Sequence, residues 1–298
     1  MDPFQAYVAF ARSYEAGSFS AVARELGSSQ SAVSKQIAAL EKSLGVQLFA
    51  RTTRRLSPTN EGMRLYEHVR QMLDAADALR AATGQAAEPA GVLRMTLPSA
   101  YGRRRITPLL PTYLERHPLV RLDVHLSDQI SDLVEDGFEL GIRIGTLAPS
   151  SLMARPVGIL EHMVVATPRY LTSHRQPEVP TDLAEHNCIL YANEGRWSRW
   201  AFESETGRHV VDVEGPVRVN DSEAMCEMVR AHMGLAMLPT WVAEEPVRKG
   251  ELLNLLPDYY PIPVPVNAVY PQTRFLSMRA RTFIDFLVDA LGTKAPPA

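Results

Sequence analysis

The chain has 298 residues, 46% of them hydrophobic and 22% charged, which is the composition of a globular protein with two or three cores. It contains no run of about 18 apolar residues and starts without the basic and apolar segments of a secretion signal, so we expect neither a membrane-spanning nor an exported protein. The net charge is −3, and the two cysteines, Cys188 and Cys226, are consistent with a reducing cytoplasm.

The charge is unevenly distributed along the chain. Residues 1–58 hold seven basic and four acidic side chains, a net charge of +3, which leaves −6 for the remaining 240 residues. Phosphate groups would therefore be attracted to the N-terminal segment and repelled by the rest. A charge of only +3 indicates that tight binding to DNA would need two such segments.

The first predicted helix begins at Asp2-Pro3, because aspartate can cap a helix and proline suits its first turn. Apolar residues at helical spacing form one face of this helix: Phe4, Tyr7, Val8, Ala11 and Tyr14. We expect this helix to support the next two helices from behind and to contact no DNA bases.

Two short amphipathic helices follow, separated by only a few residues. Their apolar faces are formed by Phe19, Val22, Ala23 and Leu26 in the first and by Val33, Ile37, Leu40 and Leu44 in the second. Between them, Gly27 suits the left-handed position that ends a helix, and Ser28 or Ser29 can cap the next one. Two helices joined by such a turn form a helix-turn-helix.

The second of these helices has the side chains best suited to contact DNA. Its apolar face is used for packing, and its N-terminal part presents Gln30, Ser31, Ser34 and Lys35. Amide, hydroxyl and ammonium groups at the start of a recognition helix can reach base edges and phosphates in the major groove. The alternative is an ordinary helical hairpin whose polar face is only hydrated.

A short basic loop comes next. Apolar Val46, Leu48 and Phe49 are followed by three arginines, Arg51, Arg54 and Arg55, and then by Ser57-Pro58. Apolar anchors beside a basic loop are typical of a β-wing whose arginines contact the DNA backbone or the minor groove.

These segments resemble the N-terminal pattern of LysR-type transcriptional regulators. The resemblance rests on residues 17–23, 30–37 and 48–51, whose motif is highly specific, and it extends through the whole chain. It implies a winged helix-turn-helix, a linker helix, and an α/β effector-binding domain with two lobes arranged as in periplasmic binding proteins.

A long helix is predicted from about residue 59 to 83. Its apolar residues recur in alternating steps of four and three, the heptad spacing of a coiled coil: Leu65, Val69, Met72, Ala76 and Leu79. We expect a head of 58 residues to be too small to bury this stripe, so the helix should pair with its copy in a second chain, giving a homodimer or a homotetramer. Two recognition helices would then lie about 34 Å apart. The alternative is that this helix packs against the chain's own C-terminal domain. Residues 81–91 are small, polar and interrupted by glycine and proline, and we predict that they form a hinge.

From Val92 the periodicity becomes that of an α/β domain. In a first lobe we expect strands at 92–97, 120–126 and 140–144, a turn at 98–102, a helix from about 106 to 116 and a short helix near 130–134. In a second lobe we expect strands at 163–166, 188–191, 217–219 and 234–239 and a helix at 222–231, followed by a strand at 264–270 and a helix at 278–291 that returns to the first lobe. This order predicts largely parallel sheets with helices on their faces, and a chain that crosses between the lobes near 161–165 and 265–270.

Ligands of parallel α/β sheets bind at the carboxyl ends of the strands. The first-lobe residues expected there are Ser99, Ala100, Tyr101, Ser127, Asp128, Arg143 and Thr146. Ser99 should open a helix, so its hydroxyl and free backbone amides could bind an anionic effector such as a carboxylate. Alternatively, Ser99 only caps that helix.

The second lobe contributes further candidates, namely Tyr191, Trp197, Asn220 and Leu235. Asn220 lies beside Asp221 and Ser222, which can cap the following helix. Aromatic rings that alternate with Arg196 and Arg199 could line a ligand site, although such a loop more often packs on its own lobe.

No pattern of a catalytic, metal or cofactor site is found. The sequence has no glycine-rich phosphate loop and no nucleophile elbow, and its eight histidines lack metal-ligand spacing. We expect Cys188 and Cys226 to be buried and unreactive, although a redox switch between them is conceivable.

These observations predict a DNA-binding transcriptional regulator, without a cofactor, whose DNA binding is modulated by a small molecule. We expect a winged helix-turn-helix domain at 1–58, a linker helix and hinge at 59–90, and an effector-binding domain at 91–298. Within that domain, lobe I should comprise 91–162 and 269–298, and lobe II 163–268. The alternative is an enzyme or solute-binding protein on the same two-lobed fold, with the N-terminal helices serving assembly only.

Overall fold

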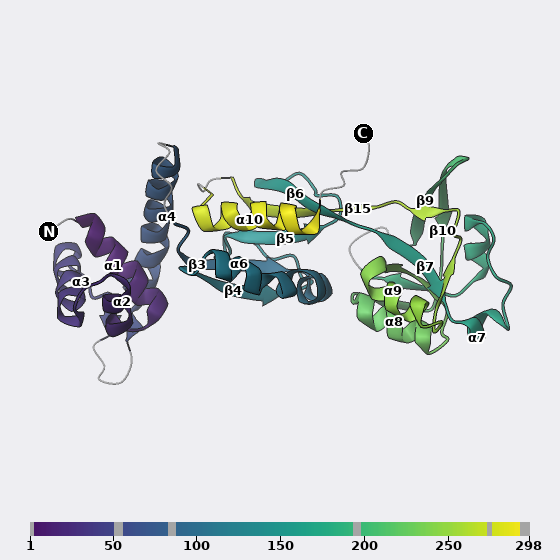
Figure 1. Cartoon of the computed structure of the whole chain (residues 1–298), viewed down its shortest axis with the longest axis horizontal. Coiled ribbons are helices and arrows are strands. Elements are labelled where there is room, and N and C mark those ends of the chain that lie inside the picture. The colour runs from purple at the N-terminus through teal and green to yellow at the C-terminus, as the bar shows by residue number, and fades with distance from the viewer. Residues whose placement is uncertain (1–2, 51–55, 83–87, 193–197, 273–275, 293–298) are drawn as a thin grey trace. The chain divides into compact units, whose positions relative to one another are not determined.

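The computed structural model describes residues 3–50, 56–82, 88–192, 198–272 and 276–292 (Figure 1). The predicted wing arginines Arg51, Arg54 and Arg55, the loop residue Trp197 and the middle of the predicted hinge lie outside these ranges. The chain divides into two compact units, one of residues 1–94, 111–123 and 270–285, the other of 95–110, 124–269 and 286–298. None of the helices described is long and apolar enough to cross a bilayer.

The first unit begins with a head of three helices, α1 (Pro3–Ala16), α2 (Phe19–Glu25) and α3 (Gln30–Leu44). Phe10, Val22, Val33 and Leu48 are fully buried at its centre. The apolar face predicted for α1 differs from the face that is buried. Phe10 was not included in the prediction and is buried, whereas Tyr7 and Val8 were included and are only half-buried. The helix packs against α2, α3 and a later helix, so its buried sector is broader than one amphipathic stripe.

The turn at Gly27 and the cap at Ser29 agree with the prediction, and a second cap, at Ser18, was not predicted. The Ser18 hydroxyl accepts the Ala21 amide at 3.3 Å and caps α2, and the Ser29 hydroxyl accepts the Ala32 amide at 3.2 Å and caps α3. Gly27 and Gly45 have φ values of 59° and 70°, the left-handed conformation that ends each helix.

The next helix, α4 (Asn60–Ala82), follows two short antiparallel strands, β1 (Phe49–Ala50) and β2 (Ser57–Pro58). Its first half packs on the head: Val69 is buried in the head core, and the Tyr66 ring stacks on Tyr14 with centroids 4.0 Å apart. In the second half, Met72 is 37% exposed and Leu79 is 71% exposed. The expectation that the head could not bury the heptad stripe therefore holds for the second half and is wrong for the first.

The lobe I sheet has five strands in the order β4-β3-β5-β15-β6. They are β3 (Gly91–Leu97), β4 (Val120–Leu126), β5 (Leu140–Ile144), β6 (Leu152–Leu160) and β15 (Val264–Pro271). The sheet is mixed, because β5 pairs parallel with β3 and antiparallel with β15. Strand β6 was not predicted, and the chain returns to this sheet at Val264, slightly earlier than expected.

A continuous helical segment joins β3 to β4, where the sequence analysis had expected a turn at 98–102. It comprises α5 (Ser99–Tyr101), the π-helix η1 (Gly102–Ile106), the 3₁₀ helix η2 (Thr107–Leu109) and α6 (Leu110–Arg116). Gly102 is needed for close packing rather than for a turn, since a Cβ there would lie 2.9 Å from the Leu97 Cβ atom. The short helix expected near 130–134 is also wrong, because the Asp132 carboxylate accepts the Val134 and Glu135 amides and forms a turn.

The last helix, α10 (Met278–Leu291), lies along the lobe I sheet, as predicted (Figure 1). The Phe283 ring meets the ring of Tyr113 in α6 edge-on, with centroids 4.9 Å apart. Both side chains are fully buried, so α6 and α10 share one core.

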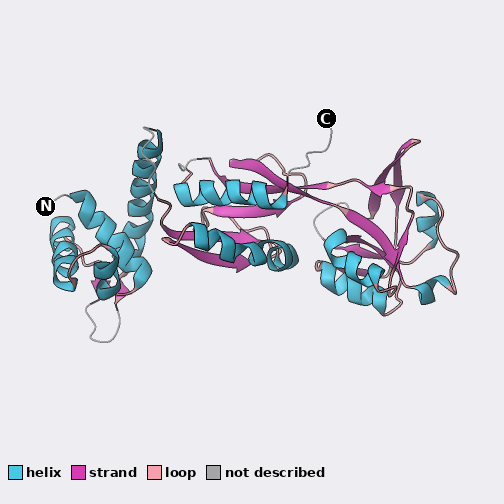
Figure 2. Cartoon of the chain, viewed as in Figure 1, coloured by secondary structure: helices cyan, strands magenta, loops and turns pink. Residues whose placement is uncertain are grey.

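Lobe II has a second five-stranded sheet in the order β11-β8-β12-β7-β13, and a three-stranded sheet in the order β10-β9-β14 (Figure 2). The strands are β7 (His162–Ala166), β8 (Cys188–Tyr191), β9 (Arg199–Ser204), β10 (Gly207–Asp212), β11 (Val217–Val219), β12 (Leu235–Pro239), β13 (Leu253–Leu255) and β14 (Tyr260–Pro261). The helices are α7 (Pro168–Leu171), the 3₁₀ helix η3 (Pro180–Glu185), α8 (Ser222–Arg230) and α9 (Thr240–Arg248). The hairpin β9–β10 and helix α9 were not predicted.

Candidate nucleic-acid interface and effector site

One edge of α3 is polar and open to solvent. Its four exposed residues are those predicted from the sequence: Gln30, Ser31, Ser34 and Lys35. On the opposite face Val33, Ile37 and Leu40 are buried in the head core. The Ser31 hydroxyl shares a hydrogen bond of 3.0 Å with the capping Ser29 hydroxyl. The edge is therefore held in place by packing on one side and by a cap at its start.

The base of the predicted wing is attached to both α3 and α4. The Glu41 carboxylate of α3 accepts the Leu48 and Phe49 amides at 2.8 and 3.2 Å. On the other side, Thr59 at the start of α4 donates its amide to the Leu48 carbonyl at 3.0 Å. Gly62 faces the same carbonyl so closely that a Cβ would lie 2.2 Å from the oxygen. The recognition helix, the wing base and the linker helix thus form one connected unit.

The carboxyl end of β3 carries Ser99, where the sequence suggested a free helix start for an anion. The Ser99 amide instead donates to the Asp128 carboxylate at 3.0 Å, and the N-cap position is taken by Pro98, which has no side-chain cap. The expectation of an unoccupied amide is therefore wrong for Ser99, because the chain supplies its own carboxylate. An anionic ligand at this amide must displace Asp128.

The corresponding strand ends of lobe II carry Tyr191 and Asn220. Asn220 is exposed, and the next residue, Asp221, caps α8 by accepting the Ala224 amide at 2.8 Å, as predicted. Burial, together with the charges of Asp128 and Asp221, raises the pKa of Tyr191 to about 12. The charges of Asp128, which follows β4, and of Asp221, which follows β11, therefore both act on the phenol at the end of β8.

Three further contacts connect α5 and η1 with α8 and α9 in the second unit. The guanidinium groups of Arg103 and Arg104 both bind the Glu223 carboxylate, the latter at 2.6 Å. The rings of Tyr101 and Trp241 meet edge-on with centroids 6.3 Å apart. The sequence analysis missed Arg103, Arg104, Glu223 and Trp241, although the run of three arginines after Gly102 was a visible signal.

The remaining candidates are placed differently. Ala100 is buried, and Ser127 uses its hydroxyl to accept the Gln129 amide at 3.1 Å. Arg143 donates to the Ser131 carbonyl at 3.2 Å, and burial lowers its pKa, while Thr146 is exposed. Leu235 is fully buried in a core and pairs with Cys188, at the opposite end of the sheet from Tyr191. The structure does not bring Leu235 to the other candidates.

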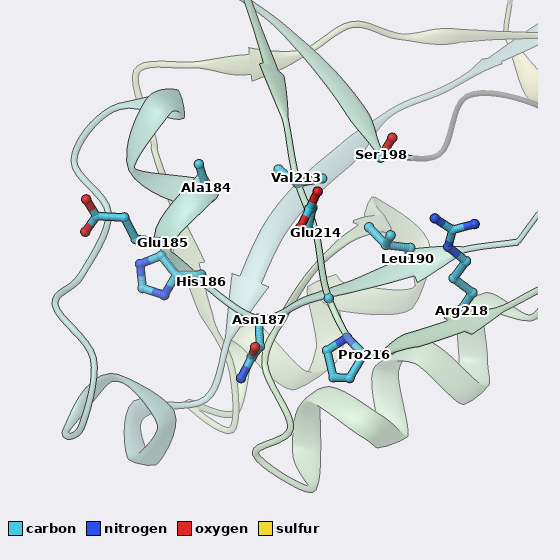
Figure 3. A pocket seen from close by; sticks show the side chains of 11 residues that line it. Ala184, Glu185, His186, Asn187, Leu190, Ser198, Val213, Glu214, Pro216 and Arg218 are labelled. Atoms are coloured by element: carbon cyan, nitrogen blue, oxygen red, sulfur yellow. The ribbon is translucent and has the colours of Figure 1, made fainter.

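A separate pocket of about 630 Å³ opens at the amino ends of β8 and β11 (Figure 3). Glu185 and His186 lie at one side of it and Arg218 at the other. The amino ends of these strands face away from Tyr191 and Asn220, so this pocket is distinct from the predicted effector site.

The two cysteines are buried, as predicted. Burial raises the pKa of Cys188 to about 12 and also raises the pKa of Cys226. Protonated thiols are poor nucleophiles and poor metal ligands. Within the described ranges, no group of three or more His, Cys, Asp and Glu residues could hold a metal ion.

Two family models match this chain. The model of the LysR substrate binding domain matches residues 86–292, and that of the bacterial regulatory helix-turn-helix protein, lysR family, matches residues 4–63. The chain belongs to the LysR family of transcriptional regulators. A LysR-family relative described as a probable HTH-type transcriptional regulator, LtrA of Klebsiella pneumoniae, is 32% identical over 286 residues, 95% of this chain and 93% of the relative.

Solved structures agree with this LysR-family assignment. CrgA, a LysR-type transcriptional regulator from Neisseria meningitidis, is 30% identical, with a TM-score of 0.60 over 97% of this chain and 98% of CrgA. The full-length virulence activator AphB of Vibrio cholerae is 24% identical, with a TM-score of 0.58 over 96% of this chain and 99% of AphB, and shows the likeness of the fold alone. The LysR-type architecture of an N-terminal helix-turn-helix and a two-lobed effector-binding domain is therefore confirmed.

Proposed function

We propose that this LysR-family chain binds a specific DNA duplex as a two-fold dimer, with the polar edge of α3 in the major groove of each half-site. The observation that carries the proposal is the exposure of Gln30, Ser31, Ser34 and Lys35 on a helix whose other face is buried. Hydroxyl, amide and ammonium groups at the N-terminal part of a recognition helix suit base edges and phosphates. In this proposal Arg51, Arg54 and Arg55 contact the backbone or the minor groove.

The linker helix supports the dimer part of the proposal. Met72 and Leu79 are large, apolar and exposed on α4, and they lie one heptad apart. Pairing of this stripe with its copy would remove both side chains from water. Two dimers would form the tetramer. We assign 1–58 to the DNA-binding domain, 59–90 to the linker and hinge, and 91–298 to the effector-binding domain. We expect the protein to act in the cytoplasm, where its DNA is located.

We further propose that a small molecule binds at the strand ends around Ser99, Tyr101, Asp128 and Tyr191 and changes the arrangement of the dimer. A ligand shifts such an equilibrium only if it prefers one arrangement. The contacts of Arg103 and Arg104 with Glu223 are candidates for what a ligand strengthens or breaks. Because the relatives are named as transcriptional regulators, we favour this role over an enzyme on the same fold.

The proposal is tested with the duplex that the wild-type chain selects from a random pool. Lys35→Ala should lower the affinity for this duplex and reduce its dependence on salt by about one phosphate contact, and Ser34→Ala should cost about 1–3 kcal/mol if Ser34 meets a base edge. Lys42→Ala is the matched control, since Lys42 is an exposed lysine two turns further along the same helix. Equal binding by the Ser34 and Lys35 variants and the parent would show that α3 is not the recognition helix.

A further inference from the structure

A buried ion pair joins the linker helix to the last helix of the chain. Arg279 of α10 and Asp74 of α4 form two contacts, Nη1 to Oδ1 at 3.0 Å and Nη2 to Oδ2 at 3.2 Å. The two side chains are only 8% and 11% exposed. Both residues belong to the first compact unit. This two-point geometry fixes the direction of the guanidinium plane as well as its position.

Arg279 is firmly attached to lobe I. Its backbone carbonyl accepts the hydroxyl of Tyr113, a fully buried residue of α6, at 2.8 Å. The start of α10 is capped by the Ser277 hydroxyl, which accepts the Ala280 amide at 3.2 Å. A displacement of α6 or α10 would therefore carry the guanidinium group with it.

The same guanidinium group also holds the segment that leads into β3. Its Nη1 atom donates to the Ala90 carbonyl at 3.3 Å. The next residue, Gly91, has a φ of 93°, and a Cβ there would lie 3.0 Å from Arg12 Nη1 and 3.5 Å from Arg279 Nη1. The entry to the effector-binding domain is thus packed between a side chain of α1 and a side chain of α10.

Head and linker are connected to this cluster by further polar contacts. Arg12 binds Glu15 at 3.0 Å, and the other oxygen of Glu15 accepts the Tyr66 hydroxyl of α4 at 3.0 Å. Burial raises the pKa of Tyr66, and Glu15 raises it further, so this hydroxyl stays a donor. The predicted hinge is therefore spanned by contacts among α1, α4 and α10.

A buried ion pair contributes little net stability compared with apolar side chains of the same size, but it defines one arrangement among several. In a dimer of paired linker helices, the angle between α4 and lobe I affects how far apart the two heads are held. We propose that Arg279 is a positioning residue: by holding Asp74, it fixes the linker helix on lobe I and thereby sets the spacing of the DNA half-sites that the dimer accepts. This inference rests on the proposed function.

The test uses the full-length chain and a series of duplexes that carry the selected half-site twice, with spacers that increase by one base pair over one helical turn. The wild type should prefer one spacing by about tenfold or more. Asp74→Asn and Arg279→Gln should reduce that preference severalfold, while the affinity for a duplex with a single half-site stays within about twofold of wild type. The exchange Asp74→Arg with Arg279→Asp should restore the preference, since it rebuilds the pair.

The matched control is Arg281→Gln, which removes an exposed arginine two residues further along α10 and should keep the wild-type spacing preference. Variants that keep the wild-type preference would overturn the inference, and so would a parallel loss of single half-site affinity, because the pair would then maintain the head rather than align it. Failure of the proposed function gives a different result, in which the wild type itself selects no duplex.

Discussion

At the scale of single residues, the molecule contains buried groups whose protonation is tied to folding. The Nδ1 atom of His162 is enclosed and has no hydrogen-bond partner within the part of the chain that the structure describes. Burial lowers the pKa of His162 to about 4. The imidazole is therefore neutral in the folded state at physiological pH, because charging it would need solvation that the site does not provide.

This predicts a pH-dependent stability. The folded pKa of His162 lies below the unfolded value of about 6.5, so between these values the unfolded state binds more protons and stability falls as the pH falls. Relative to pH 7.5, the wild type should lose about 2 kcal/mol at pH 5.0 through this group. The stability of the His162→Gln variant should fall by about 2 kcal/mol less than that of the wild type between pH 7.5 and pH 5.0.

Urea unfolding followed by tryptophan fluorescence measures the effect, because the three tryptophans, Trp197, Trp200 and Trp241, all fall in the lobe II part of the sequence. His68→Gln is the control, since His68 is exposed on α4. An identical drop in stability for the His162 variant and the wild type would contradict the assignment.

Residue-level signals were predictable where their cause is local. Ser29 and Gly27 have the cap and turn roles expected of them, because those roles depend on the residues immediately beside them. The roles of Asp128 and Phe10 depend on distant parts of the chain. Asp128 accepts the amide of Ser99, 29 residues away, and Phe10 is buried where α1 packs against other helices. Local sequence patterns do not contain either of these contacts.

At the scale of elements, α4 approaches the wing base closely, and adding one methyl group at Gly62 tests whether this contact matters. Gly62→Ala would place a Cβ 2.2 Å from the Leu48 carbonyl oxygen, which is backbone and cannot easily move. Overpacking of this kind costs about 1–3 kcal/mol, more than the gain of about 1 kcal/mol from alanine in a helix. We expect faster amide hydrogen exchange in α3 and α4 and weaker binding of the selected duplex.

The neighbouring substitution Glu61→Ala provides the control, since Glu61 is exposed on the same turn of α4. Unchanged exchange and DNA binding in the Gly62 variant would show that the contact between the linker helix and the wing base has no energetic role.

The elements themselves were predictable in part. Strongly periodic segments such as α3, α4, β4 and α10 were located within a few residues. The helix start at Ser99–Tyr101 was taken for part of a turn at 98–102, because Pro98 and Gly102 on either side of it are equally typical of turns. The hairpin β9–β10 was missed although buried Trp200 and Phe202 alternate in β9, because the arginines and aromatic residues at its start were taken for a loop that could line a ligand site. The mixed pairing of β5 and of β12 also depends on strand order, which local periodicity does not contain.

At the scale of the whole molecule, the chain contains a basic head, a linker helix with an exposed apolar stripe, and a two-lobed effector-binding domain. The family models match the two ends of this arrangement, residues 4–63 and 86–292. In the proposed dimer, two heads of net charge +3 each would double the number of phosphate contacts that one head can make.

The central claim is therefore that two chains, paired through α4, read two half-sites. Replacement of the two exposed residues of the heptad stripe, Met72→Glu with Leu79→Glu, should place like charges in the seam and yield a monomer. Light scattering after size-exclusion chromatography measures the mass. Glu67→Gln, which changes a charge elsewhere on the same helix, should leave the dimer intact.

The most direct test combines selection from a random duplex pool with footprinting of the enriched sequence. For the wild type we predict an inverted repeat bound by two chains, with protected major grooves about 34 Å or a multiple of that distance apart. The Met72 and Leu79 double variant should protect neither groove at the same concentration. A wild-type chain that remains monomeric, or that enriches no sequence even at low salt, would contradict the account.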